Sequence, residues 1–299
     1  MTVINASQTR DGEGVARSMS MRTSRAIAHT LTYIVLTLGG VMILIPLVWQ
    51  FLTAVKPSQE VFSQNLWPSE FRWENFTNSW VGQTSRGFKG WLFLKNTLIL
   101  SLNGAIATVI SSSLVAYGFA RHEFPGRDFL FLVCLSTMML PGLVTMIPTF
   151  VLFRTLGWLD TFKPLMVPAW TAGAYNIFLF RQFFLAMPPE LEDAARIDGC
   201  SDIGFYLRIL MPLSWPVIAT VAIFSFRYTW QDFMGPLIYL TNHKNFTLTL
   251  GLGMFRSEFG TRWNELMAVS LIIMLPPLLL FFFAQRWFIQ GIVFTGIKG

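Results

Sequence analysis

The stretch PPELEDAARIDGCSDIGFYLRILMPLSWP, residues 188–216, is the longest charged interruption in the second half of a very apolar chain. Its charged residues are Glu190, Glu192, Asp193, Arg196, Asp198, Asp202 and Arg208. Apolar segments long enough to cross a membrane precede and follow it. This arrangement predicts a loop that lies in water beside the membrane and contacts another molecule.

The composition indicates a membrane protein. Of the 299 residues, 53% are hydrophobic and 13% are charged, whereas a soluble domain carries roughly 25% charged residues. Lipid is therefore the main solvent, and we expect one bundle of helices. The net charge of +6 is spread over loops, and no Lys/Arg run interleaves with aromatic residues, which argues against a nucleic-acid partner.

Residues that commonly carry catalysis or bind metals are few and scattered. Cys134 and Cys200 lie far apart, no CxxC or Cys/His spacing occurs, and the three histidines are isolated. Neither a disulfide nor a metal site is therefore predicted. The chain also has no HExxH, GxSxG or GxxxxGK[ST] motif. We predict a subunit that is not an enzyme and binds no cofactor itself.

Six apolar segments, each near the roughly 20 residues that cross a bilayer, predict an all-α membrane protein with six transmembrane helices. The predicted spans are residues 28–52, 92–118, 129–150, 164–186, 212–233 and 266–288. They lack the alternation expected of a membrane β-barrel. The polar residues 1–27 predict a disordered cytosolic tail, and residues 28–299 a single transmembrane domain.

Basic residues near the first span predict its orientation. Four arginines precede this span, and only Lys56 follows it closely. Because positive charge favours the cytosolic side, the N-terminus is expected inside the cell. With six spans the C-terminus is also inside, residues 188–216 form a cytosolic loop, and residues 56–90 and 234–265 face outward.

Within residues 188–216, the local signals predict helix, glycine turn and helix. Pro188 and Pro189 suit a helix start, and the acidic residues that follow complement the helix dipole. Gly199 suits a left-handed turn after a helix end, and Ser201 or Asp202 can cap the next helix. The predicted apolar face of that helix is Ile203, Tyr206, Leu207 and Leu210. A passive connector among lipid headgroups is the alternative interpretation.

The spacing in this loop resembles the EAA loop of importer-type ABC permeases. That pattern is E-A-A, three residues, G, nine residues and I-x-L-P, and here it runs Asp193-Ala194-Ala195, Gly199, then Ile209 to Pro212. Asp193 replaces the usual Glu, and Glu192 just before it could share the role.

Further blocks, in the order of the chain, resemble the carbohydrate-uptake branch of these permeases, of the maltose-permease G type. They include residues 54–57 (AVKP), 116–121 (AYGFAR), 124–127 (FPGR), 138–141 (MMLP), 285–291 (QRWFIQG) and 295–299 (TGIKG). The resemblance extends over residues 46–299 and implies the fold of a type I ABC importer permease.

The resemblance also implies partners and roles. It implies a heterodimer with a second permease subunit, two ATPase subunits that bind ATP-Mg, and an extracytoplasmic solute-binding protein in a bacterial inner membrane. It assigns coupling to the ATPase to Glu192, Asp193, Ala194, Ala195, Asp198, Gly199, Ile209 and Pro212. The solute is a sugar, an oligosaccharide or a sugar derivative.

Polar and aromatic side chains inside spans are candidates for the solute path, because burying them in lipid is costly. Such residues are Tyr175, Asn176, Arg227, Trp230 and Gln231. They can bind a sugar through hydrogen bonds and ring faces, or instead join helices and form an interfacial aromatic belt. Arg227 can meet an anionic sugar, pair with an acid of a partner, or reach the outer interface.

A secondary transporter or channel that works alone is the alternative function. It would need carboxylates within the spans for ion coupling, or an internal repeat. The acids in or near spans are Asp128, Asp232 and Glu265, and no convincing repeat is present. The sequence therefore favours the permease.

Overall fold

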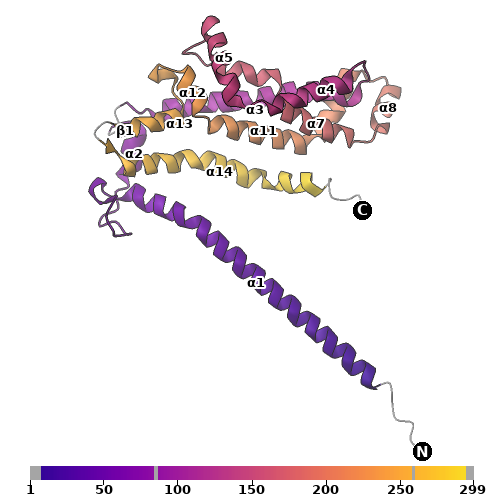
Figure 1. Ribbon diagram of the computed structural model, residues 1–299, viewed down its shortest axis with the longest axis horizontal. Helices are drawn as coiled ribbons and strands as arrows, with labels where there is room; N and C mark the ends of the chain where they lie inside the picture. The colour runs from indigo at the N-terminus through magenta and orange to yellow at the C-terminus, as the bar shows by residue number, and fades with distance from the viewer. Residues whose placement is uncertain (1–7, 84–86, 258–259, 294–299) are drawn as a thin grey trace, which may run out of the picture.

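Helices dominate the computed structural model, which describes residues 8–83, 87–257 and 260–293 (Figure 1). In chain order the helical elements are α1 (Gln8–Val55), η1 (Ser58–Glu60), α2 (Glu74–Val81), α3 (Gly90–Arg121), α4 (Arg127–Ser136), η2 (Thr137–Met139), α5 (Gly142–Thr155), α6 (Lys163–Met166), η3 (Val167–Thr171), α7 (Ala174–Leu185), α8 (Glu190–Ile197), α9 (Asp202–Phe205), η4 (Tyr206–Leu210), α10 (Met211–Leu213), α11 (Trp215–Trp230), α12 (Met234–Tyr239), η5 (His243–Asn245), α13 (Leu248–Gly251), η6 (Leu252–Phe255) and α14 (Trp263–Val293). Two short strands, β1 (Arg256–Ser257) and β2 (Gly260–Thr261), pair antiparallel.

Three of these helices are long and apolar enough to cross a membrane, over Ile27–Val55, Gly90–Arg121 and Trp263–Gln285. Two bent helix pairs meet the same test. The first joins Arg127–Met139 to Gly142–Thr155 at 96°, and the second joins Asp202–Leu213 to Trp215–Gln231 at 79°. The described chain thus has three to five candidate spans, and the predicted number of six stays a prediction.

The predicted span over residues 164–186 differs most from a straight helix. It consists of α6, the 3-10 turn η3 and α7, and it is not among the candidate spans of the described chain. Pro168 stands within η3, and Ala172 has a φ of 56°. An L-residue in this left-handed region cannot continue a helix, so the chain turns before α7 begins.

Proline also explains the bend between α4 and α5. Leu140 is extended, with φ −78° and ψ 117°, and Pro141 follows it. The pyrrolidine ring disfavours helical backbone in the preceding residue, which ends η2 and lets α5 leave in a new direction. In the other bent pair, Ser214 lies at the junction with α11, and Pro216 stands in the first turn of that helix.

Helix α3 is the centre of the bundle. It packs against α11 and α7, and α14 lies along α11 (Figure 1). Two apolar clusters form the core. One joins α3, α7, α8, η4 and α11 at the end where α8 lies, and the other joins α2, α3, α11, η6 and α14 at the opposite end.

Helix α1 contacts α14 and α2, and then diverges from the bundle (Figure 1). Residues 27–46 of this helix are exposed on every side. The helix begins at Gln8, so it includes most of the predicted tail. Residues 1–7 and the C-terminal block 295–299 lie outside the described residues, and the predictions for them stay predictions.

Candidate functional site

The first half of the loop over residues 188–216 has the predicted helix and glycine turn. Helix α8 ends at Ile197, and Gly199 has a φ of 79°. The Gly199 N–H donates to the Arg196 carbonyl at 3.0 Å, and the Cys200 N–H donates to the Ala195 carbonyl at 2.9 Å. These two bonds make a Schellman motif, which needs a left-handed residue at the position of Gly199.

The second half of the loop begins with the predicted cap. The Ser201 hydroxyl accepts a hydrogen bond from the Gly204 N–H at 3.2 Å. Helix α9 then continues into η4, a π-helical turn. Such turns are rare and are often found at functional sites.

The predicted apolar face of this second helix is divided between the core and the surface. Tyr206 and Leu210 are buried, whereas Ile203 is 72% exposed and Leu207 is 59% exposed. The core cluster around α3 and α7 covers Tyr206 and Leu210, which form one edge of the face. The other edge is left open, so Ile203 and Leu207 are available to another molecule.

The coupling candidates on α8 divide between two faces. Asp193, Ala194 and Asp198 are exposed, whereas Ala195 is buried in the core cluster and the Glu192 side chain is 10% exposed. Glu192 therefore points into the chain, and it cannot share the expected outward role of Asp193 in this conformation. Of the remaining candidates, Gly199 and Pro212 are exposed and Ile209 is partly buried.

Buried and exposed charges link α8 to its surroundings. The Glu192 carboxylate accepts a hydrogen bond from the Arg196 guanidinium at 2.9 Å and forms an ion pair with Arg121 at 3.8 Å. Arg196 also lies 3.6 Å from the Asp202 carboxylate, across the glycine turn. The acidic residues thus include one that holds the loop together as well as those that face solvent.

Two residues of this site were not identified from the sequence. Ile197 is 86% exposed on α8, between the exposed Asp193–Ala194 pair and the turn at Gly199. Its signal is an apolar side chain within an acidic loop. Arg121, at the end of α3, is buried beneath the loop. Its sequence signals are a single cation at the end of an apolar segment, which also fits a membrane-interface residue, and its place at the end of the block 116–121.

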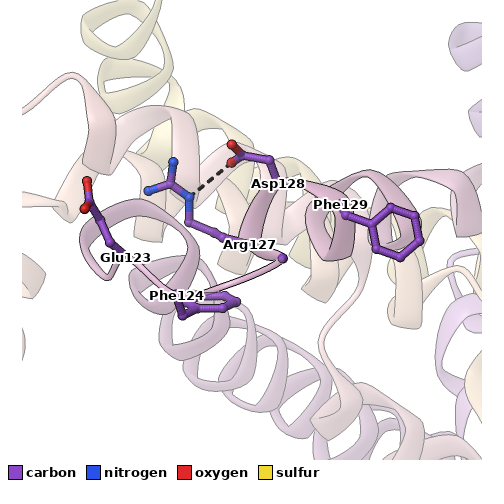
Figure 2. A pocket seen from close by; sticks show the side chains of 6 residues that line it. Glu123, Phe124, Arg127, Asp128 and Phe129 are labelled. Carbon is purple, nitrogen blue, oxygen red and sulfur yellow. Dashed lines mark hydrogen bonds and ion pairs between the residues drawn. The ribbon is translucent and has the colours of Figure 1, made fainter.

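A pocket of about 280 Å³ lies in the connection between α3 and α4 (Figure 2). Its lining residues are Glu123, Phe124, Gly126, Arg127, Asp128 and Phe129. The Arg127 guanidinium and the Asp128 carboxylate form an ion pair at 3.1 Å. Because the lining comes from one short turn, this hollow is a feature of the connection and joins no distant elements.

The solute-path candidates fall into three places. Tyr175, which is 46% exposed, and Asn176, which is partly buried, lie at the start of α7. Arg227 is exposed near the end of α11. Gln231 directly follows this helix, one turn after Arg227, and is also exposed. Trp230 is separate from both pairs, because its side chain is only 1% exposed and belongs to the core cluster with Phe226 and Ile273.

The buried position of Trp230 favours the second of its two predicted roles, that of joining helices. Its indole N–H donates to the Ile273 carbonyl in α14 at 3.1 Å. The α-helical partner of that carbonyl would be the N–H of residue 277, which is a proline and has none. Trp230 therefore satisfies a carbonyl that Pro277 leaves free, and in doing so it joins α11 to α14.

Polar side chains of α3 likewise bond to carbonyls of the irregular segment formed by α6, η3 and α7, which we call the broken segment. The Asn103 amide donates to the Met166 carbonyl at 3.2 Å and accepts from the Trp170 indole N–H at 3.3 Å. The Ser111 hydroxyl lies 3.3 Å from the Ala169 carbonyl. Irregular backbone at membrane depth is tolerated where protein groups satisfy it, and these contacts meet that condition. Among the described residues no group of three His, Cys, Asp or Glu side chains is placed to hold a metal ion.

A bundle of apolar helices long enough to cross a membrane, joined by a structured polar loop, is the architecture of an integral membrane protein. The family described as binding-protein-dependent transport system inner membrane component matches residues 109–293, and the chain belongs to this family.

Relatives match most of the chain. The arabinooligosaccharides transport system permease protein AraQ of Bacillus subtilis is 34% identical over 277 residues, which are 91% of this chain and 96% of the relative. The sn-glycerol-3-phosphate transport system permease protein UgpE of Pectobacterium atrosepticum is 35% identical over 269 residues, 88% of this chain and 95% of the relative.

A solved structure has the same fold. It is that of a bacterial ABC transporter involved in the import of the acidic polysaccharide alginate, and it matches with a TM-score of 0.77 and 20% sequence identity. The match covers 89% of this chain and 98% of that chain. The ABC importer permease fold that the sequence resemblance implied is thus confirmed.

Proposed function

We propose that this chain is the permease subunit of an ATP-driven, binding-protein-dependent importer for a carbohydrate. The family supports the transport role, and the relatives are named for arabinooligosaccharides and glycerol 3-phosphate. The solved structure of similar fold is that of an alginate importer. Polyhydroxylated solutes are common to these proteins, so the substrate class is a sugar, an oligosaccharide or a sugar derivative.

The loop over residues 188–216 is the proposed contact with the ATPase. The single observation that carries the proposal is that this loop is structured and exposes apolar side chains to solvent. Its exposed residues Asp193, Ala194, Ile197, Ile203 and Leu207 offer apolar side chains beside carboxylates. The sequence has no GxxxxGK[ST] phosphate loop. As the family resemblance implies, ATP is bound and hydrolysed by two separate ATPase subunits in this proposal, and their closure reaches this chain as a mechanical movement.

The proposed topology has six spans, with both termini in the cytosol of a bacterium and the chain in its inner membrane. The C-terminal end of α14 and the loop helix α8 lie toward the same end of the molecule, and α2 and α13 lie at the other end (Figure 1). With α8 in the cytosol, residues 56–90 and 234–265 are outside, where the binding protein delivers its solute.

A second, different permease subunit completes the translocation path in this proposal. Residues 27–46 of α1 are exposed on all sides, so lipid or a partner covers them. Tyr175, Asn176, Arg227 and Gln231 are the residues of this chain proposed for the solute path, because their side chains are exposed or partly buried.

Replacing Gly199 with valine tests the docking role. A side chain at a φ of 79° is strained by about 1–2 kcal/mol, and valine, as a β-branched residue, is a particular outlier there. A Cβ at this position meets no atom within 4 Å, so only the backbone turn is disturbed. We expect the Gly199→Val chain to insert in the membrane but to lose co-purification with the ATPase subunits.

Gly157→Val is the matched control. Gly157 also has a positive φ, of 68°, and open space within 4 Å of its Cβ, but it lies in the connection between α5 and α6. This variant should insert and retain the ATPase. If Gly199→Val also retained the ATPase and supported ATP-driven uptake, the loop would not be the docking element.

A further inference from the structure

A line of polar contacts joins helix α3 to the loop over residues 188–216. Ser113, Tyr117 and Arg121 follow one another at intervals of four residues, and therefore lie near one face of α3. The Ser113 and Tyr206 hydroxyl oxygens are 2.7 Å apart. The Tyr117 hydroxyl donates to the Asp202 carbonyl at 3.2 Å. We call these contacts, together with the Arg121–Glu192 ion pair, the α3 seam.

Arg121 has the most contacts in the α3 seam. One terminal nitrogen of its guanidinium donates to the Phe184 carbonyl at 2.8 Å and the Met187 carbonyl at 3.1 Å. The other lies 3.8 Å from the Glu192 carboxylate. A cation is favoured at the C-terminal end of a helix, which is where Phe184 and Met187 lie relative to α7. One side chain thus joins the end of α3, the end of α7 and the start of α8.

Because the Arg121–Glu192 pair is buried, its stability depends on the shape and charge of both side chains. The Arg121 and Glu192 side chains are 8% and 10% exposed. A buried ion pair is disrupted when one partner is removed, because the other charge is left without compensation. A lysine at position 121 would keep the charge, but it lacks the planar fork that reaches two carbonyls and a carboxylate at once.

We infer that Arg121 is a positioning residue that fixes the loop to α3, so that α8 and α3 move as one body when the ATPase subunits close. The inference rests on the proposed function and adds the element that receives the movement. The α3 seam spans both halves of the loop, since Glu192 lies in α8 and Tyr206 in η4. Helix α3 in turn packs against α7 and α11, so it can pass the movement to the bundle.

Distance measurements between spin labels on α8 and α3 test this inference in the complete transporter. One label replaces exposed Glu190, which is on α8 but is not among the proposed coupling residues, and the other replaces Leu102, which is 51% exposed; the two cysteines of the chain are changed to serine. The complex is measured without nucleotide and after trapping with ATP and vanadate. In the otherwise wild-type chain, the distance should stay the same in the two states.

The Arg121→Met variant should trap nucleotide, but its α8–α3 distance should shift or its distribution broaden on trapping. In Arg121→Lys the α8–α3 distance should shift in the same direction, because a positive charge without the planar guanidinium does not restore the contacts. Arg127→Met is the matched control, since Arg127 forms its ion pair with the adjacent Asp128 and lies outside the α3 seam. The α8–α3 distance of this variant should stay constant. If Arg121→Met does not assemble, Tyr206→Phe removes another contact of the seam while keeping the ring.

The outcomes separate the two proposals. A wild-type chain that neither binds the ATPase nor traps nucleotide contradicts the proposed function. If the wild-type complex traps nucleotide and its α8–α3 distance changes, the single-body movement is wrong. If Arg121→Met, or Tyr206→Phe in its place, keeps the wild-type distance in both states, the α3 seam does not fix the loop to α3.

Discussion

Trp230 shows how one side chain can compensate for a proline in a neighbouring helix. Pro277 lies inside α14 and lacks the N–H that would bond to the Ile273 carbonyl. The Trp230 indole N–H, 43 residues earlier in the chain, donates to that carbonyl at 3.1 Å. The hydrogen bond lets α14 keep Pro277 within an apolar helix, where an unsatisfied carbonyl would be costly.

Replacing Trp230 with phenylalanine should lower the stability of the subunit by about 1–3 kcal/mol, because a buried carbonyl loses its donor. The loss should be smaller when Pro277 is alanine, since the backbone N–H of residue 277 can then bond to Ile273. Thermal unfolding of the purified variants in detergent measures the four stabilities. Equal losses from Trp230→Phe with and without Pro277→Ala would show that the indole does not compensate for the proline.

At this scale, the sequence predicted what local chemistry determines. Gly199 and Ser201 have the turn and the cap that their residue types favour. The orientation of Glu192, by contrast, depends on Arg121, which is 71 positions earlier in the chain. The contact of Trp230 depends on α14. Such pairings are set by the packing of helices, which a single sequence does not show.

Among the elements, the broken segment from α6 to α7 depends most on a neighbouring helix. Its irregular backbone lies against α3, and Asn103 and Ser111 contact its carbonyls. The apolar run over residues 164–186 predicted a membrane span, but apolar length alone does not distinguish a straight helix from a broken one. The partners of Asn103 and Ser111 depend on how the helices pack, which a single sequence does not show.

Replacing Asn103 with leucine should destabilise the bundle by roughly 0.6–1.7 kcal/mol, the range for hydrogen bonds between membrane helices. Two contacts are lost, one to the Met166 carbonyl and one from the Trp170 indole. Thermal unfolding in detergent again provides the measurement. Ser136→Ala is the control, because its hydroxyl bonds to the Val133 carbonyl within its own helix, and it should change stability little. If both variants unfolded at the wild-type temperature, Asn103 would not support the broken segment.

The whole molecule has two distinct ends and one helix that the rest of the chain hardly covers. The loop helix α8 lies at one end, and α2 and α13 lie at the other (Figure 1). Helix α1 diverges from the bundle, and its residues 27–46 need lipid or a partner around them. The sequence predicted the membrane class and the family correctly, since both depend on composition and spacing. The divergence of α1 requires the three-dimensional arrangement.

Single cysteines should report the two sides of the membrane. In a chain with Cys134 and Cys200 changed to serine, cysteines at the exposed positions Ala194 and Asp198 should react with a membrane-impermeant maleimide only from the cytosolic side. Cysteines at exposed Gln59 and Lys244 should react only from outside. The same labelling pattern for all four positions would contradict the proposed orientation.

ATP-driven uptake by the reconstituted transporter tests the central claim most directly. Proteoliposomes would contain this chain, its partner permease and the ATPase subunits, with the binding protein outside and ATP inside. Uptake would be measured with a panel of radiolabelled oligosaccharides and polyol phosphates. We predict uptake of at least one solute that requires ATP and every subunit, and that disappears when the ATPase is omitted. Uptake of the same solute by this chain alone, without ATP, would contradict the account and favour a transporter that works by itself.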